Sequence, residues 1–312
     1  MRLPAAQKGV ALITALLIVA LAAVISVELS MRLQLDIRRS GNVIASDQAL
    51  LYLKHAEYYA RRTLKEDRLD NNYDSLDEDW AMELPPFPVE GGSVLGRLTD
   101  LQGCFNLNSL YYNEQPNALA QQRFNRLMQR LPSPPVTDLS QAIIDWIDAN
   151  PDTTLPDGAE DSYYLNQERP YRSAGQPLLS LSELRLIKGF TDGEIMQRSE
   201  SFLCAFGPPA DINVNTAPAE VLESLAANIS TAMVADIIVQ RQTNPSQTMQ
   251  EFLSDYNLST VITDTAGLSV SSDYFLLESE ARIGQARTLM YSIIHRENNG
   301  DTQVIARSQG AY

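Results

Sequence analysis

The chain begins with a short basic segment that is followed by a long apolar run. Residues 1–9 contain Arg2 and Lys8 and no acid, and Val10 to Val27 gives 18 residues without a charge. That length is just enough to cross the hydrocarbon core of a bilayer as a helix. Because the positive residues precede the run, we expect the start to stay in the cytoplasm and everything after Glu28 to be exported.

The helical pattern continues beyond the apolar run. From Glu28 to Glu66 there is no proline, and only Gly41 interrupts the helix formers. Apolar residues there fall on one stripe, which would pack onto a following domain: Val43, Leu50, Leu53, Ala60 and Leu64. The alternative is a secretory signal peptide cleaved at the far end of the run. The length of the run and the unbroken continuation favour one helix over residues 10–66, with residues 10–27 in the membrane.

Strand patterns stand on both sides of a long middle region. Residues 93–108 alternate loosely, which predicts two short strands after a loop at 67–90. Residues 274–283, 286–297 and 302–309 read as three strands, separated by hairpin signals at Gly284-Gln285 and Asn298-Asn299-Gly300-Asp301. We expect residues 67–108 and 268–312 to form an antiparallel sheet with the opening helix on one face, an α+β head.

The residues between these strands have helical periodicity. Five segments carry it: 120–131, 138–149, 180–189, 216–227 and 231–242. Ser180 or Ser182 before Glu183, and Thr216 with Pro218, supply helix starts. The sequence therefore predicts an all-helical insertion between strands of one sheet, with one subdomain over 109–210 and a second over 211–267.

Charge and cysteine content limit the classes of function. The chain has 24 basic and 39 acidic residues, a net charge of −15, which disfavours nucleic acid and anionic lipid surfaces as partners. Cys104 and Cys204 lack metal-site spacing; in an oxidising periplasm they would pair, and in a cytosol they would be buried apolar residues. A bridge would tie the insertion to the sheet and contribute about 4–5 kcal/mol in the chain-entropy model.

Residues 138–168 hold the most suggestive chemistry. The segment contains no basic residue and eight carboxylates: Asp138, Asp145, Asp148, Asp152, Asp157, Glu160, Asp161 and Glu168. Asp145 and Asp148 are three apart, hence on one helix face, and residues 157–161 form a tight loop that can fold back to them. A hard divalent cation would neutralise such a cluster, and calcium tolerates irregular loops better than magnesium. The spacing is not that of an EF-hand, and a solvated acidic loop is the alternative.

Two other functions find little support. Residues 212–253 are similar to a helix-hairpin-helix module, but their turn, Ala227-Asn228-Ile229-Ser230, lacks the glycines that hold a phosphate, and Arg241 is the only flanking base. A packing scaffold is therefore the better interpretation, and no nucleic acid is expected. Neither GxSxG, HExxH nor CxxC occurs, and His55 and His295 have no catalytic neighbours in the pattern, so we expect no enzyme.

The N-terminus resembles that of a type IV prepilin or pseudopilin. The resemblance rests on a basic leader ending in Gly9, followed directly by VALITALLIVALAAVIS. It implies that the prepilin peptidase cuts after Gly9 and that the amino group of Val10 is methylated. Most such proteins carry a glutamate where this chain has Thr14. A carboxylate in an apolar filament core needs a cation, the amino terminus of a neighbouring subunit, so a subunit without it need not sit on another subunit.

A missing glutamate together with a large head resembles the minor pseudopilin K family of type II secretion systems. The resemblance implies an inner-membrane protein with a single span and a periplasmic C-terminal head, at the tip of the pseudopilus, where it initiates or caps assembly for protein export. It implies a pilin-like fold and, as partners, the minor pseudopilins I and J and the prepilin peptidase, with secreted substrates or the secretin as further candidates. The alternative function is a membrane-anchored periplasmic binding module or hydrolase that uses the helical insertion.

The acidic segment shares in this resemblance. DWIDxxxxxxxxDGAEDxxY, followed by PYRSAGQPLLSLSEL, is similar to the calcium-binding helical subdomain of the family. The resemblance implies a structural calcium. The expected ligands are first Asp145, Asp148, Glu160 and Asp161, and then Asp157 and Asp152.

Overall fold

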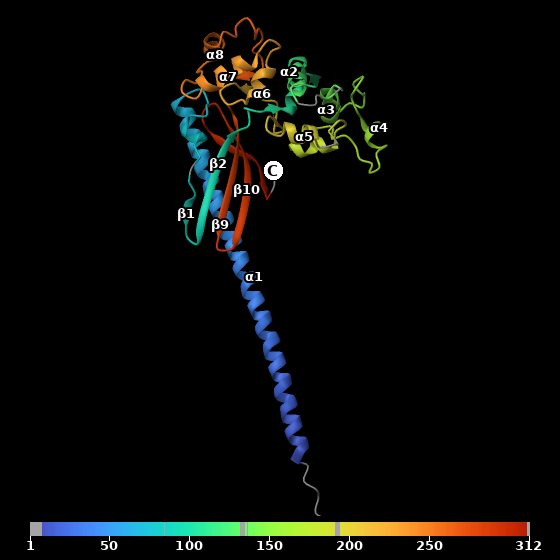
Figure 1. Ribbon diagram of the computed structural model, residues 1–312, viewed down its shortest axis with the longest axis vertical. Coiled ribbons are helices and arrows are strands. Elements are labelled where there is room, and N and C mark those ends of the chain that lie inside the picture. The colour runs from blue at the N-terminus through green and yellow to red at the C-terminus, as the bar shows by residue number, and fades with distance from the viewer. Residues whose placement is uncertain (1–7, 84, 132–134, 136, 191–193, 311–312) are drawn as a thin grey trace, which may run out of the picture.

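A computed structural model describes residues 8–83, 85–131, 135, 137–190 and 194–310. One long helix, α1 (Lys8–Asp70), extends away from a head that lies at the C-terminal end of the helix (Figure 1). Most of the predicted leader, residues 1–7, lies outside the described residues. The helix extends the predicted span of 10–66 at both ends, and its 63 residues reach roughly 95 Å at 1.5 Å per residue.

The two halves of α1 have different surroundings. Over the first half every described side chain is exposed, and an 18-residue window there has a mean hydropathy of 2.9. Packing begins near Ala45, and Leu53 and Leu64 are fully buried. The prediction that Val43 belongs to the buried stripe is wrong, since it is 60% exposed. The helix extends well beyond the lower end of the sheet (Figure 1).

The head is a five-stranded antiparallel sheet against which the second half of α1 packs. Its order is β1 (Phe87–Val89), β2 (Gly92–Asp100), β9 (Tyr274–Ile283), β10 (Ala286–Arg296) and β11 (Thr302–Gln309). β2 and β9 lie side by side, with Gly92 opposite Ile283 and Asp100 opposite Phe275. The expected α+β, pilin-like fold is confirmed. The insertion lies in the sequence between β2 and β9, which are neighbouring strands of the sheet.

Apolar side chains join α1 to the sheet in two small clusters. Ala49 and Leu53 pack on Val94, Ala281 and Met290. Higher up, Ala60, Leu64 and Trp80 pack on three sheet residues: Phe275, Leu277 and Ile294. Trp80 belongs to a short helix, η1 (Asp79–Ala81), in the segment after α1.

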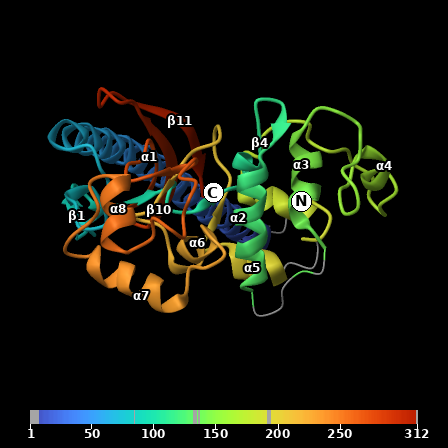
Figure 2. The ribbon, with the colours of Figure 1, turned by 90° about the horizontal axis from the view of Figure 1, so that it is seen from above.

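The insertion contains seven α-helices among the described residues. They are α2 (Ala118–Gln129), α3 (Leu139–Ile147), α4 (Asp161–Tyr164), α5 (Glu194–Ser199), α6 (Ala219–Ser224), α7 (Thr231–Gln240) and α8 (Met249–Asp255). Two 3-10 helices, η2 (Leu107–Leu110) and η3 (Leu181–Leu186), accompany them. Buried apolar residues from Phe105 to Val270 form one continuous cluster. Figure 2 shows α7 and α8 on one side of α2, and α3 and α4 on the other.

Three short strand pairs link parts of the insertion to one another. Of their strands, only the one at residues 105–106 lies in a segment, 93–108, for which the sequence predicts strands, and it does not join the five-stranded sheet. β3 (Phe105–Asn106) pairs with β6 (Leu203–Cys204), and β7 (Ile212–Asn213) pairs with β8 (Leu268–Ser269), both in parallel. β4 (Tyr111–Tyr112) and β5 (Gln115–Pro116) form a small hairpin. Beside the β3–β6 ladder, a disulfide joins Cys104 to Cys204, 100 residues apart in the sequence.

Candidate functional site: the acidic loop of the insertion

Helix α3 carries two carboxylates into the core. Its sequence LSQAIIDWI is mostly apolar, and eight of its nine residues are buried. Asp138 is the N-cap of α3 and accepts a hydrogen bond from the N–H of Ser140, and Asp148 is the C-cap. Because Asp145 lies on the packed part of the helix, its side chain is 0% exposed, and Asp148 is 5% exposed.

The loop after α3 folds back onto Asp145. The N–H of Thr154 donates to both carboxylate oxygens of Asp145, at 3.2 and 3.1 Å. Gly158 presses against the same carboxylate: a Cβ at this position would lie 2.2 Å from Oδ2 of Asp145 and 2.3 Å from the carbonyl of Thr154. The sequence therefore needs glycine here. The loop leads directly to Glu160, which precedes α4 and is 4% exposed.

Asp145, Asp148 and Glu160 thus form a buried acidic group without a base. Oδ1 of Asp148 and Oε1 of Glu160 are buried and have no hydrogen-bond partner. Within the described ranges, none of the three carboxylates takes part in a salt bridge; the adjacent Asp161 pairs with Arg172. Burying unpaired carboxylates is costly unless a cation or a proton compensates them.

The electrostatics reflect this shortage of positive charge. Burial raises the pKa of Glu160 to about 7, and the charges of Asp145 and Asp148 add to the effect, while the hydrogen bond from Ser173 opposes it. Burial also raises the pKa of Asp148, with a further contribution from the charge of Asp145. Near neutral pH the group therefore holds a proton for part of the time unless a cation takes its place.

The remaining predicted ligands lie at the edge of this group. Oδ1 of Asp161 accepts hydrogen bonds from the N–H of Ser173, at 3.0 Å, and from its hydroxyl, at 3.2 Å. Asp157 commits Oδ2 to the backbone N–H of Asp138, at the start of α3. Asp152 is exposed, yet its charge raises the pKa of Asp148. The structure thus buries Asp145, Asp148 and Glu160 near enough for their charges to interact. Their carboxylate oxygens do not all lie within 4.8 Å of one another; among the described residues only Asp67, Asp74 and Glu78 form such a group.

Three further residues shape the site, and the sequence assigned them no chemistry. Ser173 donates to Glu160 and Asp161, and Arg172 pairs with Asp161 at 3.2 Å. Lys188 closes the loop from the other side, since its ammonium donates to the carbonyls of Asp157 and Gly158, each at 3.1 Å. The spacing of these residues carries no signal, because tertiary packing alone brings them to the loop.

The exposed half of α1 is the second candidate functional element. Gly9 and Val10 lie in its first turn. The hydroxyl of Thr14 donates to the carbonyl of Ala11 at 3.0 Å, within its own helix. Thr14 therefore offers no charge to a neighbouring chain, and its polar group is already satisfied. Helix α1 is long and apolar enough to cross a membrane.

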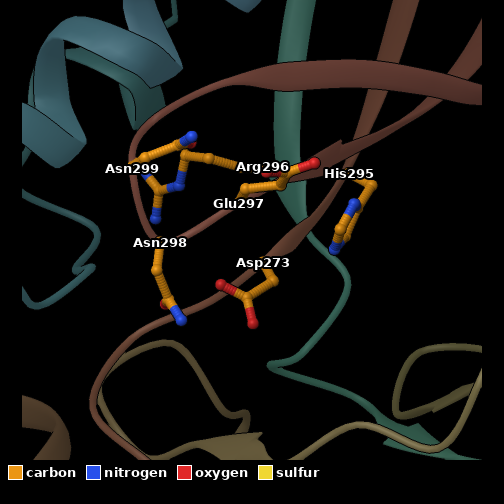
Figure 3. Close-up of a pocket in the computed structure, with 6 residues that line it drawn as sticks. All are labelled: Asp273, His295, Arg296, Glu297, Asn298 and Asn299. Atoms are coloured by element: carbon orange, nitrogen blue, oxygen red, sulfur yellow. The ribbon is translucent and has the colours of Figure 1, made fainter.

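A cavity of about 420 Å³ lies beside the β10–β11 turn (Figure 3). Its lining is Asp273, His295, Arg296, Glu297, Asn298 and Asn299, which includes no serine, threonine or cysteine nucleophile. His295 and Arg296 extend from β10 in different directions (Figure 3). The imidazole of His295 packs 4.8 Å from the ring of Tyr274, and Arg296 reaches the buried Asp74. The hydrolase alternative gains no support from this cavity.

Arg241 is the one basic residue that flanks the helix-hairpin-helix-like module, and it lies at the end of α7 away from the turn. Arg241 is buried and donates from Nη1 to the carbonyl of Val214 at 3.0 Å. Burial also lowers its pKa to about 10. The guanidinium is therefore part of the packing between α7 and the segment that follows β7.

Comparison with known proteins matches nearly the whole chain to one family. Two family models described as "Type II secretion system (T2SS), protein K" match residues 103–209 and 212–271. The chain is 32% identical to the type II secretion system protein K of Pseudomonas aeruginosa, over 97% of this chain and 93% of that protein. The chain belongs to the type II secretion system protein K family. The protein K of Aeromonas hydrophila is also 32% identical, over 97% of each chain.

A solved structure supports the same assignment. A chain of the GspK-GspI-GspJ complex from the type 2 secretion system of enterotoxigenic Escherichia coli superposes with a TM-score of 0.76. The sequence identity is 28%, and the match covers 88% of this chain and 100% of that one. The resemblance to the protein K family is confirmed, and its relatives carry the name of a secretion system component rather than that of an enzyme.

Proposed function

We propose that this protein K family member is a minor pseudopilin at the tip of a periplasmic pseudopilus. It would be anchored in the inner membrane by the first half of α1, with its head in the periplasm. There it would initiate or cap the assembly that drives protein export across the outer membrane. Its partners would be the minor pseudopilins I and J, since the matching solved chain belongs to a complex of K, I and J.

One observation carries the proposal of a tip position. The insertion sits at the end of the sheet farthest from the N-terminus of α1, and α3 and α4 overhang to one side (Figures 1 and 2). A subunit stacked above would have to place its own helix through the space that this lobe occupies. Thr14 supports the same position, because its hydroxyl is satisfied inside α1 and gives a neighbour no carboxylate.

Labelling of purified pseudopili tests the position. Gold-conjugated antibodies against residues 103–271 should mark one end of each filament, and non-immune antibodies on the same pseudopili are the control. Labels spaced along the shaft would contradict the tip position. Loss of co-purification with I and J on deletion of the insertion, with the head still folded, would place their contact in the insertion.

Processing of the N-terminus is the second part of the proposal. A prepilin peptidase would cut after Gly9 and methylate the amino group of Val10, so that the whole apolar half of α1 stays in the mature protein. Intact mass analysis of the protein extracted from membranes should give a chain starting at Val10 with one added methyl group. An uncleaved chain, or one that starts near residue 30, would mean that α1 is not an assembly helix.

The third part is a structural calcium ion in the acidic loop. The donors that the site offers are hard carboxylate oxygens, which calcium prefers, and two of them have no other partner. Asp145, Asp148 and Glu160 would hold the ion, with Asp161 at the edge. The ion would supply positive charge to a buried acidic group and so stabilise a loop that has little packing of its own. Isothermal titration of the metal-free protein with calcium tests binding directly, with magnesium as the comparison.

A further inference from the structure

The chain crosses between the sheet and the insertion at two neighbouring points. It leaves the sheet at Asp100, the last residue of β2, and returns at Ser272, just before β9. Asn213 of β7 and Thr216, both from the insertion, lie against these crossings. We call these four residues, together with Asp74, the seam. Asp74 belongs to the segment after α1 and accepts a hydrogen bond from the N–H of Ser272 at 2.7 Å.

Asp100 is the centre of the seam. Its Oδ2 accepts hydrogen bonds from Thr216 Oγ1 at 2.5 Å, Ser272 Oγ at 2.7 Å and Asn213 Nδ2 at 3.1 Å. Its Oδ1 accepts from the N–H of Gln102 at 2.7 Å. All four donors are neutral, and the side chain is 7% exposed. This buried carboxylate therefore has hydrogen bonds but no cation bonded to it.

The charged groups that face the seam are predominantly acidic. From the α1 side come Asp67, Asp74 and Glu78, whose carboxylate oxygens lie within 4.8 Å of one another. Arg296 of β10 compensates two of them, since it donates to Asp74 from Nη2 at 2.6 Å and to Asp67 from Nη1 at 2.8 Å. The guanidinium of Arg296 thereby supplies the positive charge that this acidic group needs. Arg68 turns to Asn298 and lies 3.9 Å from Asp273, which is 43% exposed at its side chain.

The protonation equilibrium agrees with this surplus of negative charge. Burial raises the pKa of Asp100 to about 6, against the hydrogen bonds from Thr216 and Ser272, and the charge of Asp74 adds to the rise. Burial, together with the charges of Glu78 and Asp74, raises the pKa of Asp67 to about 7. A carboxyl whose pKa is raised in the folded state stabilises that state at low pH, and this contribution is lost as the pH rises through the folded pKa.

We infer that the seam is an acid-favoured joint: when Asp100 takes up a proton, the closed contact between the insertion and the sheet becomes more stable. With a proton, the carboxyl donates to one hydroxyl instead of only accepting. Thr216 can turn to permit this, since its Oγ1 also lies 3.4 Å from the carbonyl of Asn213. Because the hydrogen bonds of Asp100 link the two parts of the chain, opening the seam exposes the carboxyl to water and releases its proton.

Hydrogen exchange at the seam tests the joint in the full-length chain, held in detergent micelles and saturated with calcium. Amides of Gln102, Asn213 and Ser272 report the opening, after correction for their intrinsic exchange rates. The opening constant should be roughly tenfold smaller at pH 5 than at pH 7.5, for a group titrating near 6 in the closed state and near 3.9 when open. Equal constants at the two pH values would overturn the inference.

Two variants assign the effect to Asp100. Asp100→Asn, which mimics the protonated carboxyl, should abolish the difference between pH 5 and pH 7.5, whereas the partly exposed Asp273→Asn should keep it. If Asp100→Asn does not fold, Ser272→Ala serves instead: it removes one donor to the ionised form and should shift the midpoint of the effect to higher pH. An unchanged pH dependence in Asp100→Asn, or an unmoved midpoint in Ser272→Ala, would place the proton elsewhere and refute the joint.

Discussion

Glu57 of α1 and Arg307 of β11 form a two-point ion pair between the long helix and the edge strand of the sheet. Nε and Nη2 of Arg307 donate to the two carboxylate oxygens at 2.7 and 2.8 Å, and Ser292 of β10 donates a third hydrogen bond at 2.9 Å. Burial of Glu57 alone would raise its pKa, but the hydrogen bonds from Arg307 and Ser292 outweigh it, so the pKa is lowered. This pair therefore stabilises the packing of the helix on the sheet at pH values above the usual pKa of a glutamate, and the stabilisation is lost as the pH falls through the lowered pKa of Glu57.

Replacing Arg307 by methionine should lower the free energy of unfolding by about 1–2 kcal/mol, because a buried carboxylate loses its charged partner while Ser292 remains. Urea unfolding of the full-length chain in micelles measures the change. Arg282→Met is the matched control, since Arg282 pairs with Glu280 on the exposed face of the sheet and should cost less than about 0.5 kcal/mol. Equal losses in the two variants would mean that the Glu57 pair does not fasten the helix.

Calcium and protons should compete at Glu160. Its pKa, about 7 in the metal-free protein, is raised, so the metal-free loop gains stability as the pH falls below 7 and loses it as the pH rises through that value. Calcium should reverse this trend, because the ion needs the ionised carboxylate. We expect calcium binding to release close to half a proton at pH 7 and to weaken towards pH 6.

Titration calorimetry in two buffers with different ionisation enthalpies measures that proton release. Glu160→Gln should lose both the release and most of the affinity, whereas Glu168→Gln, at an exposed position of the same segment, should keep both. If melting of the wild type and of Glu160→Gln responds alike to calcium and to a chelator, the ion does not bind at this group.

Gly158→Ala should disturb the same site by sterics alone. An added Cβ would lie 2.2 Å from Oδ2 of Asp145, so the loop or the carboxylate must move. We expect at least a tenfold loss of calcium affinity and a lower melting temperature. Gly41→Ala is the control: a Cβ there meets nothing within 4 Å, and alanine favours a helix by about 0.5–1 kcal/mol. Unchanged calcium affinity in Gly158→Ala would mean that calcium binding does not depend on the close approach of Gly158 to Asp145.

Features set by local pattern were predictable from the sequence, and features set by distant contacts were not. The apolar run, the hairpin at Gly284 and the burial of Leu53 and Leu64 all follow from periods of residues close in sequence. Val43 belongs to the same predicted helical stripe as Leu53 but is exposed. Packing ends where the sheet ends, although the helix continues. β1 lies at the end of the segment 67–90 for which the sequence predicts a loop, and its Pro88 is tolerated because β1 is an edge strand.

The candidate site divides in the same way. Helical spacing placed Asp145 and Asp148 on one face, but it did not relate them to Lys188, and Ser173 entered only as part of the quoted family motif, with no role assigned. The seam is the extreme case, since the partners of Asp100 stand 113, 116 and 172 residues away along the chain. A lone aspartate at the end of a strand has no local signal that distinguishes it from a turn residue.

The bridge between Cys104 and Cys204 should contribute much of the stability of the insertion. It closes a loop with a sequence separation of 100, for which the chain-entropy model gives about 4–5 kcal/mol. It also lies beside the β3–β6 ladder, in which Asn106 pairs with Cys204. Because that ladder has only two residue pairs, we expect it to open first when the bridge is removed, and the β2–β9 pairing to persist.

The double variant Cys104→Ser/Cys204→Ser tests this by urea unfolding and by hydrogen exchange at Phe105 and Cys204 or its replacement. Reduction of the wild type should reproduce the loss of stability, which separates the effect of the bridge from that of the serines. Amides of β9 should keep their protection, since Leu277 and Phe275 still pack on α1 and η1. A loss below about 1 kcal/mol, or equal loss of protection in β3 and β9, would contradict a bridge that acts on the insertion through loop closure.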